Sequence, residues 1–176
     1  MFSSIKKMLN DDIQKLSDFA RENKCITVIF VTRNQIAADI RTVLKCYYGC
    51  PSFGTNKMCP PYTISPERFF PILKKYKYGL LVETSASDIN QAVVRIEKEA
   101  IKMGYLFAFG MRGGACPLCP SCTLPNELCC KPVEARPSME ALGIDVFKTV
   151  KNAGINKNKL ASLNEDFTFF GLILID

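Results

Sequence analysis

The chain has 176 residues, 48% of them apolar and 23% charged, which predicts one soluble domain spanning residues 1–176 with a sizeable core. Histidine is absent, so mixed Cys/His zinc sites, Rieske centres and an imidazole general base are excluded. The longest apolar run, residues 167–175, is too short to span a membrane, and the first residues do not resemble a signal peptide. Nine cysteines then predict a cytoplasmic protein that uses its thiols for metal binding or redox chemistry.

The formal net charge of +6 counts every cysteine as neutral. A four-iron cluster held by four thiolates carries a charge of about −2, so bound clusters would offset much of this positive excess. The cations that stand near cysteines in the sequence are Arg41, Lys45, Lys57, Arg112, Lys131 and Arg136. Nearby positive charge stabilises thiolates, and we therefore expect neither a nucleic-acid partner nor a membrane partner.

The N-terminal third predicts a helix followed by a buried strand. Apolar residues recur at helical spacing over residues 11–23, and residues 25–33 are β-branched and apolar. Cys25 lies in this strand, far from the other cysteines, and is expected to pack as a small apolar residue. Residues 34–45 fit either a helix or an extension of the strand into the first cysteine loop.

The middle of the chain predicts a helix and then a strand–helix–strand unit. The helix begins at Ser65 and Pro66 and runs to about Tyr76. The unit that follows is expected to comprise a strand over 77–84, a helix over 88–103 and a strand over 105–111. Its length is typical of a parallel crossover, which would be right-handed.

The C-terminal part predicts a helix over 139–152, capped by Ser138, and a central strand over 166–175, where almost every residue is apolar. Together, these elements predict a single α/β domain. It would contain a mixed sheet of about four strands with helices packed on it. Two cysteine-rich, metal-binding loops would meet at one edge of the sheet.

The second cysteine loop, residues 113–137, holds five of the nine cysteines. Cys116, Cys119 and Cys122 are spaced C-x2-C-x2-C, as are the first three ligands of the bacterial ferredoxin run. A more distant cysteine would supply the fourth thiolate. The candidates are the adjacent Cys129 and Cys130, of which only one is expected to point at the metal. Glycines at 110, 113 and 114 suit a close approach of the backbone to a cluster.

The first cysteine loop reads C-x3-C-x8-C-P-P and contains Cys46, Cys50 and Cys59. Three thiolates leave two options. They could hold a cluster with one open iron, or Cys59 could complete the cluster of the second loop, as happens in two-cluster ferredoxins. The radical-SAM spacing C-x3-C-x2-C is not present.

The spacing favours an iron–sulfur cluster, one or two per chain and of the [4Fe–4S] type, over other centres. Zinc is the alternative cofactor, although all-cysteine zinc sites usually show two C-x2-C pairs far apart, and this chain has no clean second pair.

Two segments carry a family resemblance: KCYYGCPSFGTNKMCPPY and GGACPLCPSCTLPNELCCKPVEARPSMEALGIDV. With them, the chain resembles a group of predicted metal-binding proteins of unknown function. The resemblance implies a cluster site built by both loops. It also implies that the late ligand is Cys129, which precedes Pro132 and the sequence Arg136-Pro137-Ser138, whereas position 130 need not be cysteine. It supplies no reaction.

The RPSMEALGID segment adds charged residues beside the second loop. Arg136 is a candidate cofactor-binding residue that would face the thiolates. The alternative is a structural role in a salt bridge at the start of a helix, which we favour for Glu140 and Asp145.

Three functions fit these patterns. The first is an iron–sulfur protein that passes electrons to or from a redox protein partner. The second is an enzyme in which an open iron, held by Cys46, Cys50 and Cys59, acts as a Lewis acid or sulfur acceptor. The third is a zinc-binding structural or interaction module. No catalytic residue, substrate or oligomeric state follows from the sequence.

Overall fold

The structure is a computed structural model that describes residues 2–122, 128–156 and 168–176, with side chains from residue 10 onward. Its centre is a sheet of four strands in the order β1-β2-β4-β3. Their bounds are Thr27–Thr32 for β1, Tyr78–Ser85 for β2, Phe109–Met111 for β3 and Thr168–Ile175 for β4. All neighbouring pairs are antiparallel. The α/β class and the four strands are confirmed, but the prediction of a mixed sheet is wrong.

The strand–helix–strand unit explains this difference. Strands β2 and β3 run in the same direction, because each is antiparallel to β4, which lies between them. Helix α4 (Ile89–Lys102) therefore crosses over an intervening strand. The sequence indicates the crossover correctly, and the central position of β4 is confirmed. The local pattern could not show that β4 would insert between the two parallel strands.

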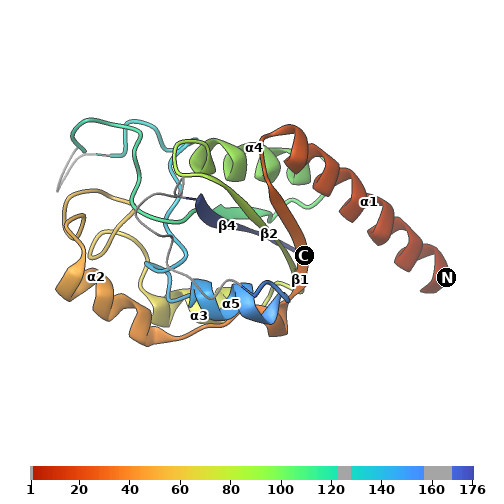
Figure 1. Cartoon of the computed structure of the whole chain (residues 1–176), viewed down its shortest axis with the longest axis horizontal. Helices are drawn as coiled ribbons and strands as arrows, with labels where there is room; N and C mark the ends of the chain where they lie inside the picture. Colours follow the sequence, from red (N-terminus) through yellow and green to blue (C-terminus); the bar gives the residue numbers. More distant parts are fainter. Residues whose placement is uncertain (1, 123–127, 157–167) are drawn as a thin grey trace.

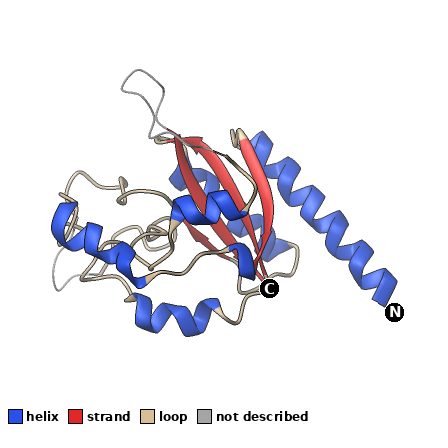
Figure 2. Ribbon diagram, turned by 60° about the horizontal axis from the view of Figure 1, so that its bottom comes forward, coloured by secondary structure: helices blue, strands red, loops and turns tan. Residues whose placement is uncertain are grey.

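Helices cover both faces of the sheet, as Figures 1 and 2 show. Helices α1 (Phe2–Glu22) and α4 pack on one face, in a core that includes Leu16, Val93, Ile96, Leu80 and Ile173. Helices α3 (Pro66–Leu73) and α5 (Val146–Asn152) pack on the other face, in a core that includes Phe69, Leu73, Val150, Leu81 and Leu172. Alternate residues of β2 and β4 thus point to opposite cores, as the two-residue period of a strand requires.

Several elements differ from their predicted bounds. Helix α1 begins at Phe2, about nine residues before its predicted start, and α3 ends at Leu73 rather than near Tyr76. Strand β3 is only three residues long, because residues 105–108 form turns in which Leu106 and Phe107 are exposed. Helix α5 begins at Val146, after Gly143 with φ +84°, and Asp145 caps it by accepting from the Lys148 amide at 2.9 Å. Residues 33–42 contain two short 3-10 turns, and helix α2 (Val43–Gly49) follows them.

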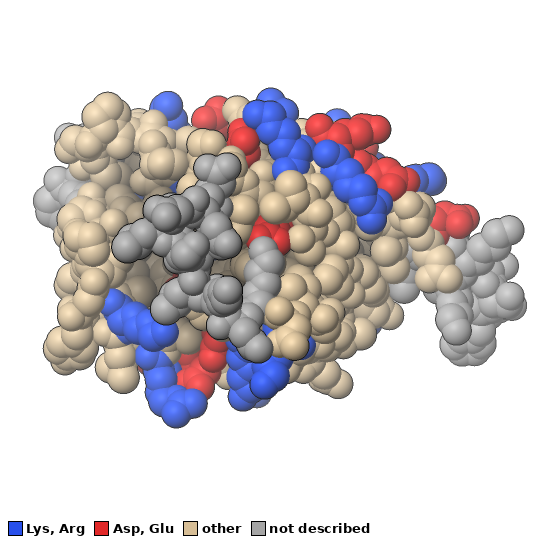
Figure 3. Space-filling view, viewed as in Figure 1, with Lys and Arg blue, Asp and Glu red and all other residues tan. Residues whose placement is uncertain are grey.

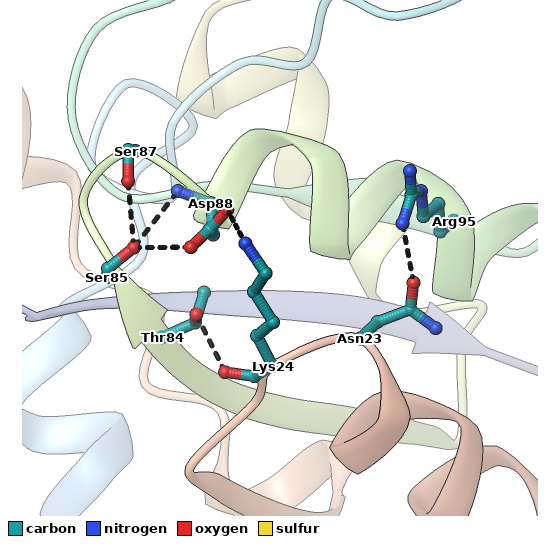
Figure 4. A network of polar contacts seen from close by, with 7 residues as sticks. All are labelled: Asn23, Lys24, Thr84, Ser85, Ser87, Asp88 and Arg95. Atoms are coloured by element: carbon teal, nitrogen blue, oxygen red, sulfur yellow. Dashed lines mark hydrogen bonds and ion pairs between the residues drawn. The ribbon is translucent and has the colours of Figure 1, made fainter.

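Polar contacts fasten the turn after α1 to the start of α4 (Figure 4). Lys24 pairs with Asp88 at 3.1 Å, while its carbonyl accepts from the Thr84 hydroxyl at 2.9 Å. Arg95 donates to Asn23 at 3.1 Å. This network lies on the α1 side of the fold, whereas the two cysteine loops extend from the opposite end of the molecule (Figure 1).

Candidate metal centre

The first cysteine loop begins inside a helix. Cys46 lies in α2, and Cys50 is the residue that ends it, so the two thiols are one helical turn apart on the same side. Cys59 is buried, and its amide donates to the Asn56 carbonyl at 3.2 Å. The chain then turns through a cis Pro60–Pro61 bond. The loop thus holds one buried thiol beneath two more accessible ones.

The second loop leaves the C-terminal end of β3. Gly113 and Gly114 are needed here, but not for the reason the sequence indicates. A Cβ at Gly113 would lie 2.8 Å from the Phe170 carbonyl oxygen, and one at Gly114 would lie 3.0 Å from the Phe169 ring. The two glycines therefore allow the loop to pack on β4, and the structure does not show that they approach a cluster.

A cavity of about 300 Å³ lies between the two loops. Its walls come from residues 52–58 of the first loop and 115–122 of the second, together with residues 129–131. The thiols that line it are Cys116, Cys119, Cys122, Cys129 and Cys130. Segments about 60 residues apart in sequence therefore form one thiol-lined hollow, which agrees with the prediction that the two loops meet.

Cys130, rather than Cys129, makes the close sulfur contact of the second loop. Its Sγ lies 3.3 Å from Sγ of Cys119, too far for a disulfide bond, and this contact contributes most to raising the pKa of Cys119. Both Cys129 and Cys130 face the cavity. The choice of Cys129 as the ligand is not tested by this arrangement and stays a prediction, and Cys130 becomes a second candidate.

Arg112 is the most deeply buried cation near the cysteines, with 4% of its surface exposed. Its Nε donates to the Gly113 carbonyl at 3.1 Å, whereas Nη1 is buried and has no hydrogen-bond partner among the described residues. Burial lowers its pKa, and the nearby Cys116 and Cys59 oppose that shift. The charge of Arg112 therefore interacts with one thiol from each loop.

Glu140 is the acidic counterpart of Arg112. Its Oε2 is also buried and without a partner in the described part of the chain, and burial raises the pKa of its carboxyl group. The structural role favoured from sequence, a salt bridge at a helix start, is not what the structure shows: Glu140 lies in a turn before α5. Asp145, in contrast, has the structural role of a helix cap.

Burial raises the pKa values of two thiols of the first loop, Cys46 and Cys59. Burial raises the pKa of Cys46 to about 11, and the neighbouring Cys50 contributes to the same shift. Burial also raises the pKa of Cys59, and again Cys50 contributes. Gathered thiols resist ionisation because their negative charges repel, and a bound cation relieves this repulsion.

Arg136 does not line the cavity between the two loops and pairs instead with Glu97. Its guanidinium forms a two-pronged pair with Glu97 of α4, in which Nε donates to Oε2 at 2.6 Å and Nη2 donates to Oε1. Oε2 of Glu97 also accepts a hydrogen bond from the Gly110 amide at 2.7 Å. These contacts favour the structural alternative for Arg136. Its role as a cofactor-binding residue stays a prediction.

Cys25 is buried in the core between α1, α4 and the sheet, as expected, and burial raises its pKa to about 11. The other eight cysteines lie in the two loops, and all nine are free thiols. Among the described residues, no three Cys, Asp or Glu side chains gather tightly enough to surround a single ion.

The residues present fit a metal centre bound through sulfur. The donors are all thiols, which are soft ligands and suit iron–sulfur clusters or zinc. The buried Arg112 donor atom without a partner lies where thiolates would need a positive neighbour. Sequence reasoning counted Arg112 only as one of several cations, because no motif distinguishes a buried arginine from an exposed one.

The fold and the loops thus define an α/β protein with thiols gathered at one end. Residues 30–175 match the family described as predicted metal-binding protein (DUF2284), and the chain belongs to this family. The resemblance identified from the sequence is confirmed, and membership supports a metal cofactor without specifying its type. Comparisons with curated proteins and with solved structures found no significant match. In the described residues, no helix has both the length and the apolar character that crossing a membrane requires.

Proposed function

We propose that this metal-binding protein is an iron–sulfur protein that carries one or two [4Fe–4S] clusters and exchanges electrons with a protein partner. The observation that carries the proposal is the cavity of about 300 Å³, which five thiols line between two loops. A site lined by thiols and accompanied by a buried arginine suits an anionic thiolate cluster. When bound, such a cluster would supply a one-electron redox centre.

The surface beside the first loop supports a protein partner. Tyr48 is 87% exposed. Tyr47 is half exposed and packs against Phe53, with ring centroids 4.7 Å apart and ring planes tilted by 46°. Exposed aromatic residues are typical of the centres of protein interfaces. Much of the loop-bearing end in Figure 3 carries few charged side chains, apart from a basic group at its lower edge. Electrons would thus leave through a surface close to Cys46 and Cys50 that exposes aromatic side chains and carries few charges.

The test is to purify the protein without oxygen and to measure iron, acid-labile sulfide and zinc per chain. Iron and sulfide in equal amounts, with a signal that is lost and regained on reduction and oxidation, are the expected result. About eight irons would indicate two clusters and about four would indicate one. One or two zinc ions per chain without sulfide would contradict the proposal and leave the zinc module.

A second candidate function, the open-iron enzyme, is favoured by one observation. Glu140 lines a cleft of about 350 Å³ whose walls include Arg41 and Lys45, and its charge acts on the Cys46 thiol. A small anionic substrate could enter past these cations toward the first loop. A spectral change when cyanide is added to the oxidised protein would support an open iron, and reversible reduction with no response to cyanide would support electron transfer alone.

A further inference from the structure

Helix α4 holds the two ends of the second cysteine loop together. Glu97 accepts from the Gly110 amide at 2.7 Å, just before the loop, and from Nε of Arg136 at 2.6 Å, near its end. Asn90 of the same helix donates to the Glu134 carbonyl at 3.1 Å. The loop therefore begins and ends beside α4. These contacts bring its early and late thiols close to one another without the first loop.

The cavity between the loops receives thiols from one side only. All five cysteines of the second loop line it, and the first loop forms the opposite wall. Among the residues that the structure describes, the first loop contributes no thiol to this lining, since Cys46, Cys50 and Cys59 all lie outside it. A metal centre in this cavity would therefore take its thiolates from the second loop. The first-loop residues of the wall are Ser52, Thr55, Asn56, Lys57 and Met58.

Cys130 is the member of the adjacent cysteine pair that turns toward the C-x2-C-x2-C run. Its Sγ lies 3.3 Å from Sγ of Cys119, so the two sulfur atoms are in van der Waals contact. For Cys129, which lines the same cavity, the described part of the chain shows no sulfur contact of this kind. Adjacent side chains leave the backbone in different directions, so only one of the two is expected to share a centre with Cys119. The contact points to Cys130.

We propose that the second loop holds a complete four-thiolate site, made of Cys116, Cys119, Cys122 and Cys130. Cys130 takes the place of Cys129, which the family resemblance implies. No first-loop thiol takes part, so the exchange of ligands seen in two-cluster ferredoxins does not occur here. The inference deepens the proposed function by naming the ligands of one cluster, and it rests on that function only for the identity of the metal.

The first test compares the two adjacent cysteines in the full chain, purified without oxygen. Cys130→Ala is expected to lose the metal of the second loop, whereas Cys129→Ala keeps the wild-type amounts of iron and sulfide. Cys25→Ala, which changes a core thiol, is the control for the removal of any cysteine. Loss of metal in Cys129→Ala with retention in Cys130→Ala, or equal loss in both, overturns the assignment of Cys130.

A second readout needs no substitution. Iodoacetamide is added to the metal-loaded wild type, and tandem mass spectrometry locates the modified cysteines. Cys130 is expected to be protected and Cys129 to be modified, because a bound metal blocks the thiolate that would react. After the metal is removed with a chelator, Cys130 should be modified as well. Protection of Cys129 with modification of Cys130 in the loaded protein contradicts the proposal.

Independence from the first loop is tested with Cys46→Ala/Cys50→Ala/Cys59→Ala. This variant is expected to keep one cluster, with about four irons per chain, and adding Cys130→Ala should remove it. Complete loss of metal in the folded triple variant overturns the inference. If the triple variant does not fold, Cys59→Ser is examined alone. It must leave unchanged the electron paramagnetic resonance signal that Cys122→Ser alters, and a shared effect on that signal counts against a self-contained site.

Failure of the proposed function is distinguishable from failure of this inference. If the wild type contains zinc and no sulfide, the iron–sulfur proposal fails. The comparison of Cys129→Ala with Cys130→Ala, counted in zinc ions, and the pattern of alkylation still decide which four thiols form the site.

Discussion

The buried pair of Glu97 and Arg136 gives the sharpest prediction on stability. Their side chains are only 7% and 12% exposed, and Glu97 accepts from Arg136 twice and from the Gly110 amide once. Glu97→Ala leaves the guanidinium buried without its partner, which costs about 3–5 kcal/mol. For a chain of this length each kcal/mol lowers the melting temperature by roughly 2–4 °C, so we expect a decrease of about 6–20 °C.

The assay is thermal unfolding followed by circular dichroism, on metal-free protein, because bound metal itself raises the melting temperature. Glu99→Ala is the matched control: it lies on the same helix and pairs with Lys102 at 2.9 Å, but that pair is largely exposed. Loss of the Glu99–Lys102 pair should lower the free energy of unfolding by less than about 1 kcal/mol. Equal effects of the two substitutions would refute the reasoning.

The same pair separates the two roles of Arg136. Replacing both partners by apolar residues, as in Glu97→Leu/Arg136→Met, should recover much of the lost stability, because no charge is left buried alone. If Arg136 is structural, this double variant keeps its iron. A stable double variant that has lost its iron would show that Arg136 binds the cofactor.

Three further predictions concern the core and one tyrosine. Burial keeps the Cys25 thiol protonated, so iodoacetamide should leave it unmodified in the folded protein; modification at the rate of an exposed thiol would contradict this. Gly171→Ala places a Cβ 2.5 Å from Cγ1 of Val93 and should cost about 1–3 kcal/mol in denaturant unfolding; an unchanged midpoint would count against the packing. Burial, aided by a hydrogen bond to Asp12, raises the pKa of Tyr105 to about 12. Its contribution to stability is therefore complete below the unfolded pKa of about 10 and is lost as the pH rises through 12, so Tyr105→Phe should weaken the alkaline decline in stability. An identical decline in both proteins would argue against this.

The elements with strong periodicity were predictable from the sequence. Helix α4 and strands β1, β2 and β4 lie close to their predicted positions, because apolar spacing reports burial directly. The sheet order was not predictable, since local patterns do not say which strand inserts between β2 and β3. Helix α5 begins seven residues after its predicted start. Ser138 caps only a turn, because Gly143 at positive φ interrupts the helical backbone and Asp145 caps the helix that follows.

The candidate site divides in a similar way. Spacing identified the cysteines, since thiols at fixed intervals are a local signal. It did not identify the burial of Arg112 or Glu140, nor the contact between Cys119 and Cys130, because these depend on how the fold brings distant segments together, as in the backbone bridge between Arg112 and Ser138. The choice between Cys129 and Cys130 likewise depends on the fold rather than on the motif.

The central position of β4 has a consequence for the order of assembly. Strand β4 is synthesised after both cysteine loops, yet it fills the gap between β2 and β3, and Gly113 and Gly114 pack against its Phe169 and Phe170. Contacts between such distant segments form late in folding, because closing long loops costs entropy first. The thiols therefore reach the ribosome exit before the support that arranges them exists. Metal delivered to the finished fold would meet loops that β4 already supports, whereas metal encountered earlier would meet loops without that support.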